Sequence, residues 1–401
     1  MTVLTSLMIW LGIGVAAMSL GYLLVAVVAV FLWEQRRPAD GVCAPPMTVL
    51  KPLCGSEPDL YENLRSFCDQ NYPDFQIIFG VRSSDDPALP VVRRLMREFA
   101  DRDLQLVVDE RVAGDNYKIS NVINMAPLAR HECLVIADSD IRVGPDYLGQ
   151  LAHGLRDPEV GLVTCLYRGR AAGPVWSRLG ALFINEWFAP SVLVGRVFGY
   201  RAFSFGATMA LRRDVLEKVG GLESLVSHLA DDYLLGERVR SLGLKTVLST
   251  YMVETTVYEP NLQALWHHEL RWARTIRTVQ PVGHAFSFVT YTIAMSLIGS
   301  LAAWGTHWAF WLPAAAFALR AVLHGVVSAK RGVSALPDVA LLPLRDVLSF
   351  LVWLMSFGSR RVQWRQQHLS VHTDGSMRLR GQGSALERAL IRSQRETEFR
   401  P

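Results

Sequence analysis

Residues 133–143 read CLVIADSDIRV, an apolar run that ends abruptly at two aspartates. A short apolar run rich in Val and Ile is typical of a buried β-strand. The pattern predicts a strand over residues 133–137, with Asp138 and Asp140 on the turn that follows it. Two carboxylates on one tight turn can reach a single hard cation such as Mg²⁺ or Mn²⁺. D-x-D is also common in solvated surface turns, but its place directly after a buried strand favours the metal site.

The region before this strand alternates between strand-like and helix-like patterns. Strands are predicted at residues 47–52, 75–81 and 104–108, and helices at residues 60–68, 91–100 and 118–126. Such alternation predicts a parallel, doubly wound α/β sheet. Ligands of these sheets bind beyond the carboxyl ends of the strands, where the aspartates at 85–86, 138 and 140 fall. The chain has no GxGxxG or GxxxxGK[ST] motif, so a dinucleotide oxidoreductase or P-loop function lacks support.

Two polar clusters lie near the predicted strand ends. Asp85 and Asp86 precede a proline, which is typical of a helix N-cap, and one of them could also accept a hydrogen bond from a uracil or ribose. Asn116, Lys118 and Asn121 begin the next predicted helix. A lysine and amides at a helix N-terminus suit nucleotide or phosphate contacts, and a capped surface helix is the alternative interpretation.

Asp231 and Asp232 lie side by side in HLADDYLLGE, residues 228–237. A carboxylate that is close to another and partly desolvated has a raised pKa, which suits a general base. The alternative interpretation is that the two carboxylates stabilise the N-terminus of a helix by their interaction with the helix dipole.

The last polar motif is HELRW, residues 268–272, on a predicted amphipathic helix. Arg271 could neutralise a leaving diphosphate, and Trp272 could line the entrance for an acceptor. A basic helix that lies on the membrane surface, with Trp272 as an interfacial anchor, is the alternative.

The composition places part of the chain in a bilayer. Half of the residues are hydrophobic and 19% are charged, against about 25% in an ordinary soluble domain. Residues 7–33 carry no charge and are long enough to span. A signal peptide would have a basic start and a shorter apolar run, so we expect an uncleaved anchor. Because Arg36 and Arg37 follow it, the N-terminus should lie outside and the chain that follows in the cytoplasm.

The C-terminal third is predicted to return to the membrane. Residues 285–304 and 308–327 predict a helical pair, whereas residues 336–357 contain Pro343, Arg345 and Asp346 and predict a re-entrant or interfacial hairpin. Residues 176–195 predict either an amphipathic helix on the bilayer or a buried core helix. The sequence predicts four regions: an anchor at 1–37, a cytosolic catalytic domain at 38–280, membrane helices with the hairpin at 281–365 and a cytosolic tail at 366–401. The part of the tail after Gly375 is polar and is expected to be loosely ordered.

The net charge of +4 is too small to indicate nucleic-acid binding and suits contact with an anionic membrane surface. The five cysteines form no CxxC pair, so they are expected to be small buried side chains in a reducing compartment rather than a disulfide framework or a zinc site.

The ordered set of motifs resembles the ceramide glucosyltransferase family, family 21 of the glycosyltransferases, with its D, D, D, (Q/R)xxRW signature. Asp86, Asp138, Asp232 and the Arg271-Trp272 pair match it, and His268 stands where the family usually has Gln or Arg. The resemblance implies a GT-A fold, a UDP-sugar donor, a divalent cation, inversion at the anomeric carbon and chemistry on the cytosolic face. It also implies that Asp232 is the base. Bacterial relatives that glycosylate hopanoids are similar to this group.

We therefore expect an integral protein of a bacterial inner membrane that moves glucose from UDP-glucose to a lipid hydroxyl, as in ceramide. Asp138 and Asp140 would hold Mg²⁺ or Mn²⁺, and Asp86, Lys118, Asn121 and Asp138 would bind the nucleotide sugar. His268, Arg271 and Trp272 are the other expected catalytic residues, and Arg271 would stabilise the departing UDP. Three alternatives stay open: transfer of N-acetylglucosamine from its UDP form to a hopanoid polyol, a processive polysaccharide synthase, and a non-catalytic membrane scaffold that binds a nucleotide sugar. The small C-terminal apolar content disfavours a polymer channel, and the retained carboxylates disfavour the scaffold.

Overall fold

The structure, a computed structural model, describes residues 3–34, 44–358, 361–364, 367–371 and 377–379. Arg36 and Arg37, which carry the predicted orientation, lie outside the described residues, as do residues 380–401 of the predicted tail. The chain divides into two compact units, which are described separately. The sheet unit contains Gln35–Tyr167 and Arg201–Thr256, and the helical unit contains Met1–Glu34, Arg168–Tyr200 and Val257–Ser359.

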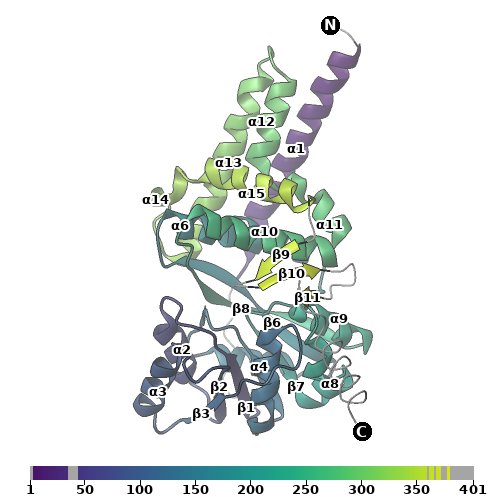
Figure 1. Ribbon diagram of the computed structural model, residues 1–401. Coiled ribbons are helices and arrows are strands. Elements are labelled where there is room, and N and C mark those ends of the chain that lie inside the picture. The colour runs from purple at the N-terminus through teal and green to yellow at the C-terminus, as the bar shows by residue number, and fades with distance from the viewer. Residues whose placement is uncertain (1–2, 35–43, 359–360, 365–366, 372–376, 380–401) are drawn as a thin grey trace, which may run out of the picture. The chain divides into compact units, whose positions relative to one another are not determined.

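An eight-stranded sheet with the order β3-β2-β1-β4-β7-β6-β8-β5 forms the centre of the sheet unit (Figure 1). Strands β3, β2, β1 and β4 are parallel, and β7 pairs antiparallel with both β4 and β6. This mixed, mostly parallel sheet confirms the predicted α/β class. The strands are β1 (Met47–Pro52), β2 (Phe75–Val81), β3 (Asp103–Val108), β4 (Cys133–Ile136), β5 (Ile141–Arg142), β6 (Val160–Ala171), β7 (Met209–Arg212) and β8 (Lys245–Val257).

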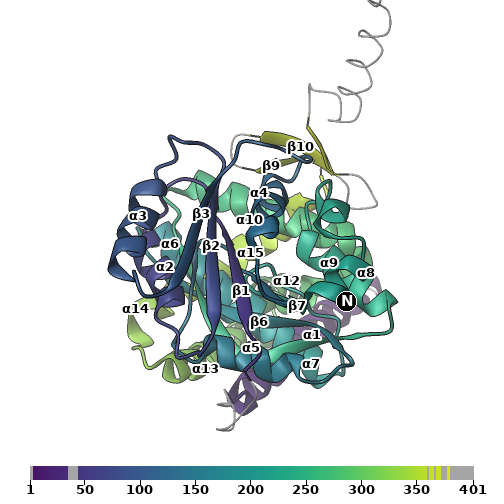
Figure 2. The same cartoon turned by 90° about the horizontal axis from the view of Figure 1, so that it is seen from below.

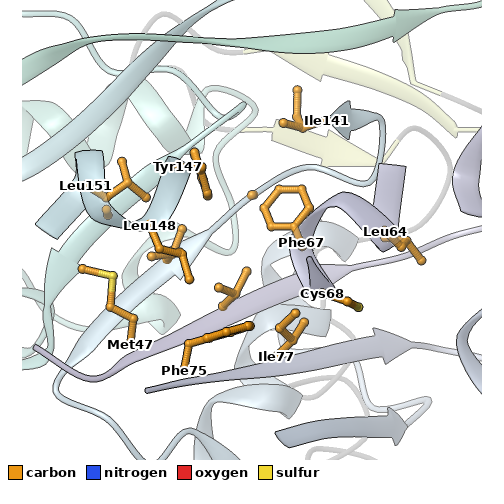
Figure 3. Close-up of a cluster of buried hydrophobic side chains, with 14 of the residues drawn as sticks. Met47, Leu64, Phe67, Cys68, Phe75, Ile77, Ile141, Tyr147, Leu148 and Leu151 are labelled. Carbon is orange, nitrogen blue, oxygen red and sulfur yellow. The ribbon is translucent and has the colours of Figure 1, made fainter. Parts of the chain in front are cut away.

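Helices cover both faces of the parallel strands because both faces are apolar. Val49 of β1 pairs with Ile77 of β2 and Val135 of β4, and these side chains pack with α2, α3 and α5. Helices α2 and α3 lie beside these strands in Figure 2, and Figure 3 shows Ile77 near Phe67 and Cys68 of α2. The alternate residues, such as Leu50, pack on the opposite face with α4, α8 and α9. The helices of this unit are α2 (Leu60–Cys68), α3 (Leu89–Glu98), α4 (Tyr117–Met125), α5 (Tyr147–Leu155), α8 (Arg213–Lys218) and α9 (Asp231–Ser241), with short 3₁₀ turns η1 (Ala126–Leu128) and η3 (Leu222–Leu225).

In the helical unit, α1, α12 and α13 run side by side, while α15 crosses their direction (Figure 1). Small residues bring α1 and α12 together: a Cβ added to Gly12 would lie 2.6 Å from the Ala302 Cβ, and one added to Gly299 would lie 2.7 Å from the Gly12 carbonyl oxygen. The elements are α1 (Val3–Leu32), α6 (Val175–Phe183), the π-helical turn η2 (Ile184–Phe188), α7 (Ala189–Val197), α10 (Leu262–Val279), α11 (Pro281–Phe286), η4 (Ser287–Thr290), α12 (Thr292–Ala302), α13 (Trp308–Arg331), α14 (Leu336–Val339) and α15 (Leu342–Ser356).

By length and composition, three segments of the described chain could cross a membrane, Val3–Leu32, Trp308–Arg331 and Leu336–Ser356. The helix predicted over residues 285–304 is broken instead: Pro281–Thr290 and Thr292–Ala302 meet at a bend of 69°. The break has a physical cause, because the Asp346 carboxylate accepts the first backbone N–H groups of α12, from Ile293 and Ala294, each at 3.1 Å.

Three smaller expectations can be compared with the structure. The segment at residues 176–195 forms α6, η2 and α7, and most of its side chains are buried, as in the core-helix interpretation. Three short strands near the C-terminus pair as an antiparallel sheet: β9 (Arg361–Trp364), β10 (Gln367–Val371) and β11 (Met377–Leu379). Of these, β11 lies in the segment after Gly375 that was expected to be loosely ordered. Cys68, Cys133 and Cys165 are buried and free as expected, whereas Cys54 is exposed.

Candidate functional site

Asp138 and Lys118 form the centre of the candidate site in the sheet unit. Asp138 follows β4, and Lys118 lies in the first turn of α4. Their side chains form an ion pair of 2.6 Å, in which the Asp138 carboxylate stays about one third exposed (36%). Burial alone would lower the pKa of the Lys118 ammonium, but Asp138 and Asp231 outweigh it and raise the pKa above its usual range. A fixed positive charge therefore lies beside an accessible carboxylate.

Asp232 joins this pair through the backbone of Gly206. The Gly206 N–H donates to the Asp232 carboxylate at 2.8 Å. A Cβ added to Gly206 would lie 3.1 Å from Lys118 Nζ, 3.3 Å from Asp138 Oδ2 and 3.6 Å from Asp232 Oδ2. Three of the predicted site residues, from three separate elements, thus converge on one position that carries no side chain.

Asp232 has the electrostatic environment of a base. Burial and the neighbouring Asp231 together raise its pKa to about 6, against opposition from Lys118 and two backbone N–H groups. Asp231 is more deeply buried and accepts a hydrogen bond from Asn116 Nδ2 at 3.2 Å. The two adjacent aspartates therefore differ in their surroundings: Asp231 is held inside the fold, whereas the Asp232 carboxylate accepts the Gly206 N–H beside Lys118 and Asp138.

Asp140 lies close to other carboxylates. Its carboxylate accepts the Thr255 hydroxyl at 2.5 Å, and the intervening Ser139 hydroxyl donates to Glu57 at 2.9 Å. Burial, Glu57 and Asp138 together raise the pKa of Asp140 to about 6. Negative charge therefore accumulates on this turn, and a divalent cation would offset it.

No group of three or more His, Cys, Asp or Glu side chains arranged to hold a metal occurs among the residues that the structure describes. Asp138 and Asp140 supply two carboxylates. In nucleotide sites Mg²⁺ is usually held by one or two carboxylates together with substrate phosphates. The donor set on this turn fits a cation that a bound phosphate would share.

Two further predicted residues make contacts with the backbone. Both Asp86 carboxylate oxygens accept the Gly55 N–H, at 3.0 and 3.1 Å, and one also accepts the Ala88 N–H at 2.8 Å. Asn121 is buried, and its amide nitrogen donates to the Leu53 and Gly80 carbonyl oxygens, the latter at 2.8 Å. Asp86 thus links the loop after β1 to the turn that precedes α3, and a nucleotide contact stays a prediction for both residues.

His268, Arg271 and Trp272 lie on α10 of the helical unit. His268 Nδ1 lies 2.6 Å from the buried Glu259 carboxylate, and the His268 and Trp272 rings meet edge to face at 4.7 Å. Glu269, inside the same motif, forms a two-pronged ion pair of 2.7 Å with Arg345 of α15. The motif therefore fixes the orientation of Trp272 and anchors α10 to α15.

Several contributors were missing from the sequence interpretation. Lys51 of β1 is fully buried, donates to the Asp138 carbonyl oxygen and lies 3.9 Å from the centre of the Phe67 ring. Burial lowers the pKa of Lys51 to about 7, against the opposing effect of Asp140 and Asp138. A lysine inside an otherwise apolar strand was the one sequence signal for it. Gly206 and Glu57 gave no such signal, because their roles depend on contacts between distant segments.

The chain is similar in sequence to known glycosyltransferases. The profile of glycosyl transferase family 21 matches residues 11–377. Ceramide glucosyltransferase 1 of Caenorhabditis elegans is 26% identical over 59% of this chain and 51% of its own length. Ceramide glucosyltransferase 3 of the same organism is 23% identical over 80% of this chain and 72% of its own length. The chain thus spans about half of the first relative and most of the second.

A mannosyltransferase from Pyrobaculum calidifontis, solved with GDP-mannose and Mn²⁺, has a similar structure. The TM-score is 0.52 at 18% sequence identity, and the match covers 87% of this chain and 99% of that one. At this identity the likeness shows the fold alone, and it confirms the expected GT-A architecture.

Proposed function

Because this chain belongs to glycosyl transferase family 21, we propose that it is an inverting hexosyltransferase that moves glucose from UDP-glucose to a hydroxyl group of a membrane lipid such as ceramide. The observation that carries the proposal is the convergence of Lys118, Asp138 and Asp232 on the empty side-chain position of Gly206. The names of the relatives support the lipid acceptor, and the three candidate spans support a place beside lipid.

The donor would bind at the turn after β4. Asp138 and Asp140 would hold a divalent cation, which supplies positive charge to the diphosphate when it is bound. Lys118 adds a fixed ammonium at 2.6 Å from Asp138. Asp86 and Asn121 would contribute to the nucleoside end of the same site.

Asp232 would act as the general base. It accepts the proton of the lipid hydroxyl while that oxygen forms a bond to the anomeric carbon of the sugar. The bond between this carbon and the phosphate oxygen breaks, and UDP leaves with its electron pair. A pKa of about 6 keeps Asp232 deprotonated at neutral pH and still basic enough to take a proton.

The residues of α10 have roles that follow from the family signature. Arg271 would stabilise the departing diphosphate, and Trp272 would line the entrance for the acceptor. His268 would hold the Trp272 ring through their edge-to-face contact. The predicted orientation places this chemistry on the cytosolic side of a bacterial inner membrane.

The proposal can be tested by identifying the product. The full chain in nanodiscs with ceramide is incubated separately with UDP-glucose, UDP-N-acetylglucosamine and GDP-mannose, and the lipids are analysed by mass spectrometry. We expect glucosylceramide from UDP-glucose and its loss in EDTA, with recovery on added Mg²⁺ or Mn²⁺. Full activity in EDTA would contradict the metal role.

The other outcomes identify the alternatives. Transfer of N-acetylglucosamine to an added hopanoid polyol, with ceramide unmodified, would show that both the donor and the acceptor differ from those proposed. A polymeric product would indicate a processive synthase, and binding of UDP-glucose without any product would indicate a scaffold. Each of these results would overturn the proposed reaction.

A further inference from the structure

Helix α15 has its polarity inverted relative to a helix of a water-soluble protein. Its inward face carries Arg345, Asp346 and Ser349, all nearly fully buried. Its outward face carries large apolar side chains that are 42–52% exposed: Leu344, Leu351, Leu354 and Met355. In water an amphipathic helix buries its apolar face and exposes its polar face. The reverse arrangement suits a helix whose outer surroundings are hydrocarbon.

The inward polar groups of α15 are paired. Arg320 of α13 binds the Asp346 carboxylate at 2.6 Å and donates to the carbonyl oxygens of Glu186 and Thr290. Arg345 makes its two-pronged contact with Glu269 of α10. Charged side chains in a membrane face the protein interior and pair with one another, which is the pattern seen on this helix.

The contacts of Asp346 show where α15 lies along the length of the apolar helices α1, α12 and α13. Its partner Arg320 lies eleven residues before Arg331, the end of α13, which is about 16 Å along the helix axis. Asp346 also receives the first N–H groups of α12, while Thr292 of α12 donates to the Ser19 carbonyl oxygen of α1. Since Ser19 lies in the middle of α1, α15 packs beside the middle of the apolar helices rather than beyond their ends.

The direction of α15 excludes a simple crossing. Leu336–Ser356 has the length and composition of a span. The continuous helix α15 is nevertheless only 15 residues, or about 22 Å, and a hydrocarbon core is about 30 Å thick. Moreover, α15 runs across the direction that α1, α12 and α13 share (Figure 1).

We propose that α15 lies flat within the leaflet nearer to Lys330 and Arg331, with its outward face in contact with lipid acyl chains. Continuity with α1 and α13, which are apolar enough to cross the membrane, favours acyl chains over another protein as the occupant of this face. The proposal concerns the helical unit alone and holds whichever sugar or acceptor lipid is used.

The test measures the depth of two positions on the helix. Leu344→Cys and Met355→Cys are made in a chain whose Cys43 and Cys54 are serine, and each is labelled with an environment-sensitive nitrobenzoxadiazole. The labelled protein is placed in nanodiscs with lipids brominated at defined acyl positions. The two sites are eleven residues apart, or about 16 Å along the axis, so their relative depths report the orientation of α15.

We expect blue-shifted emission at both positions, with maximal quenching by the same brominated lipid. Leu242→Cys, at the exposed end of α9 in the sheet unit, serves as the control and should not be quenched. If either labelled variant fails to give a monodisperse peak, Leu351→Cys on the same face replaces it. Maximal quenching of the two positions by lipids brominated at different acyl positions would overturn the flat orientation. Absence of quenching would overturn the lipid contact and indicate that solvent or a second copy of the chain covers this face.

Discussion

The two units of this protein place charge in opposite ways. In the sheet unit the interior is mainly apolar on both sides of the parallel strands, and Asp138 and Asp140 lie where β4 ends. In the helical unit the innermost groups include the Arg320–Asp346 and Arg345–Glu269 ion pairs, with side chains only 3–6% exposed, while leucines face outward. The difference supports the proposal that the outer surroundings of the two units differ, water for one and lipid for the other.

The comparison also separates two roles of buried charge. Asp138 of the sheet unit stays partly accessible and could act on a ligand. The Arg320–Asp346 and Arg345–Glu269 ion pairs of the helical unit are buried and hold helices together. Variants of the first kind should therefore change turnover, and variants of the second kind should change stability.

The largest expected effect is on Asp232. Asp232→Asn preserves shape and removes basicity, so kcat should fall roughly 10²–10⁴-fold while the affinity for UDP-glucose stays near that of the wild type. Steady-state kinetics and calorimetric titration of the donor would check both values. Asp231→Asn is the matched variant and should lose less, because Asp231 is held inside the fold by Asn116. A larger loss for Asp231→Asn would move the base by one residue.

Asp346 provides the contrasting variant in the helical unit. Asp346→Ala leaves the buried Arg320 without its carboxylate partner and removes the cap of α12. The free energy of unfolding should therefore fall by about 3–5 kcal/mol. Thermal unfolding in nanodiscs or detergent would measure the loss. Leu344→Ala, on the outward face of the same helix, should change stability much less. Equal effects of the two variants would contradict the inverted polarity of α15.

Gly206 tests the shape of the candidate site. Gly206→Ala would place a methyl group 3.1–3.6 Å from Lys118, Asp138 and Asp232. The methyl group would occupy the space that a ligand held by the three side chains would need, so we expect kcat/KM to fall roughly 5-fold to 150-fold, which corresponds to about 1–3 kcal/mol of lost transition-state stabilisation. The melting temperature should change little. Gly14→Ala, where nothing lies within 4 Å of the added atom, is the control. Normal kinetics in Gly206→Ala would show that the three side chains do not share a ligand space.

The smallest effect is expected from pH. The pKa of Asp232 is raised from 3.8 to about 6, and the base must be deprotonated to act. At saturating donor, kcat should therefore be flat above about pH 7 and should fall with decreasing pH below about 6. The fall should approach tenfold per pH unit. A kcat that stays constant down to pH 5 would remove Asp232 from the rate-limiting proton transfer.

Most of the parallel half of the sheet could be predicted from the sequence because β1, β2 and β4 are buried along their length. They appear as mainly apolar runs, and β1 and β2 have the predicted bounds, as does α2. The strand ends then located Asp138 and Asp140 without any knowledge of the contacts between segments.

What could not be predicted depends on contacts that are distant in sequence. The bend before α12 is stabilised by Asp346, more than fifty residues later, so an apolar pattern alone gave one continuous helix. The position of Gly206 beside Lys118 and Asp138 arises only when three separate elements meet. The ion pairs of the helical unit were missed for the same reason, since Arg320 and Arg345 each looked like interruptions of apolar segments.

The central claim is that one base activates the acceptor for a single displacement at the anomeric carbon. The anomeric configuration of the purified glycolipid tests it most directly. UDP-glucose carries an α-linked sugar, so a single displacement must give a β-glucoside, which proton NMR of the anomeric position identifies. A β-linked product made by the wild type and lost in Asp232→Asn is the result we predict. An α-linked product would require a second displacement or a front-side reaction, and would contradict the role given to Asp232.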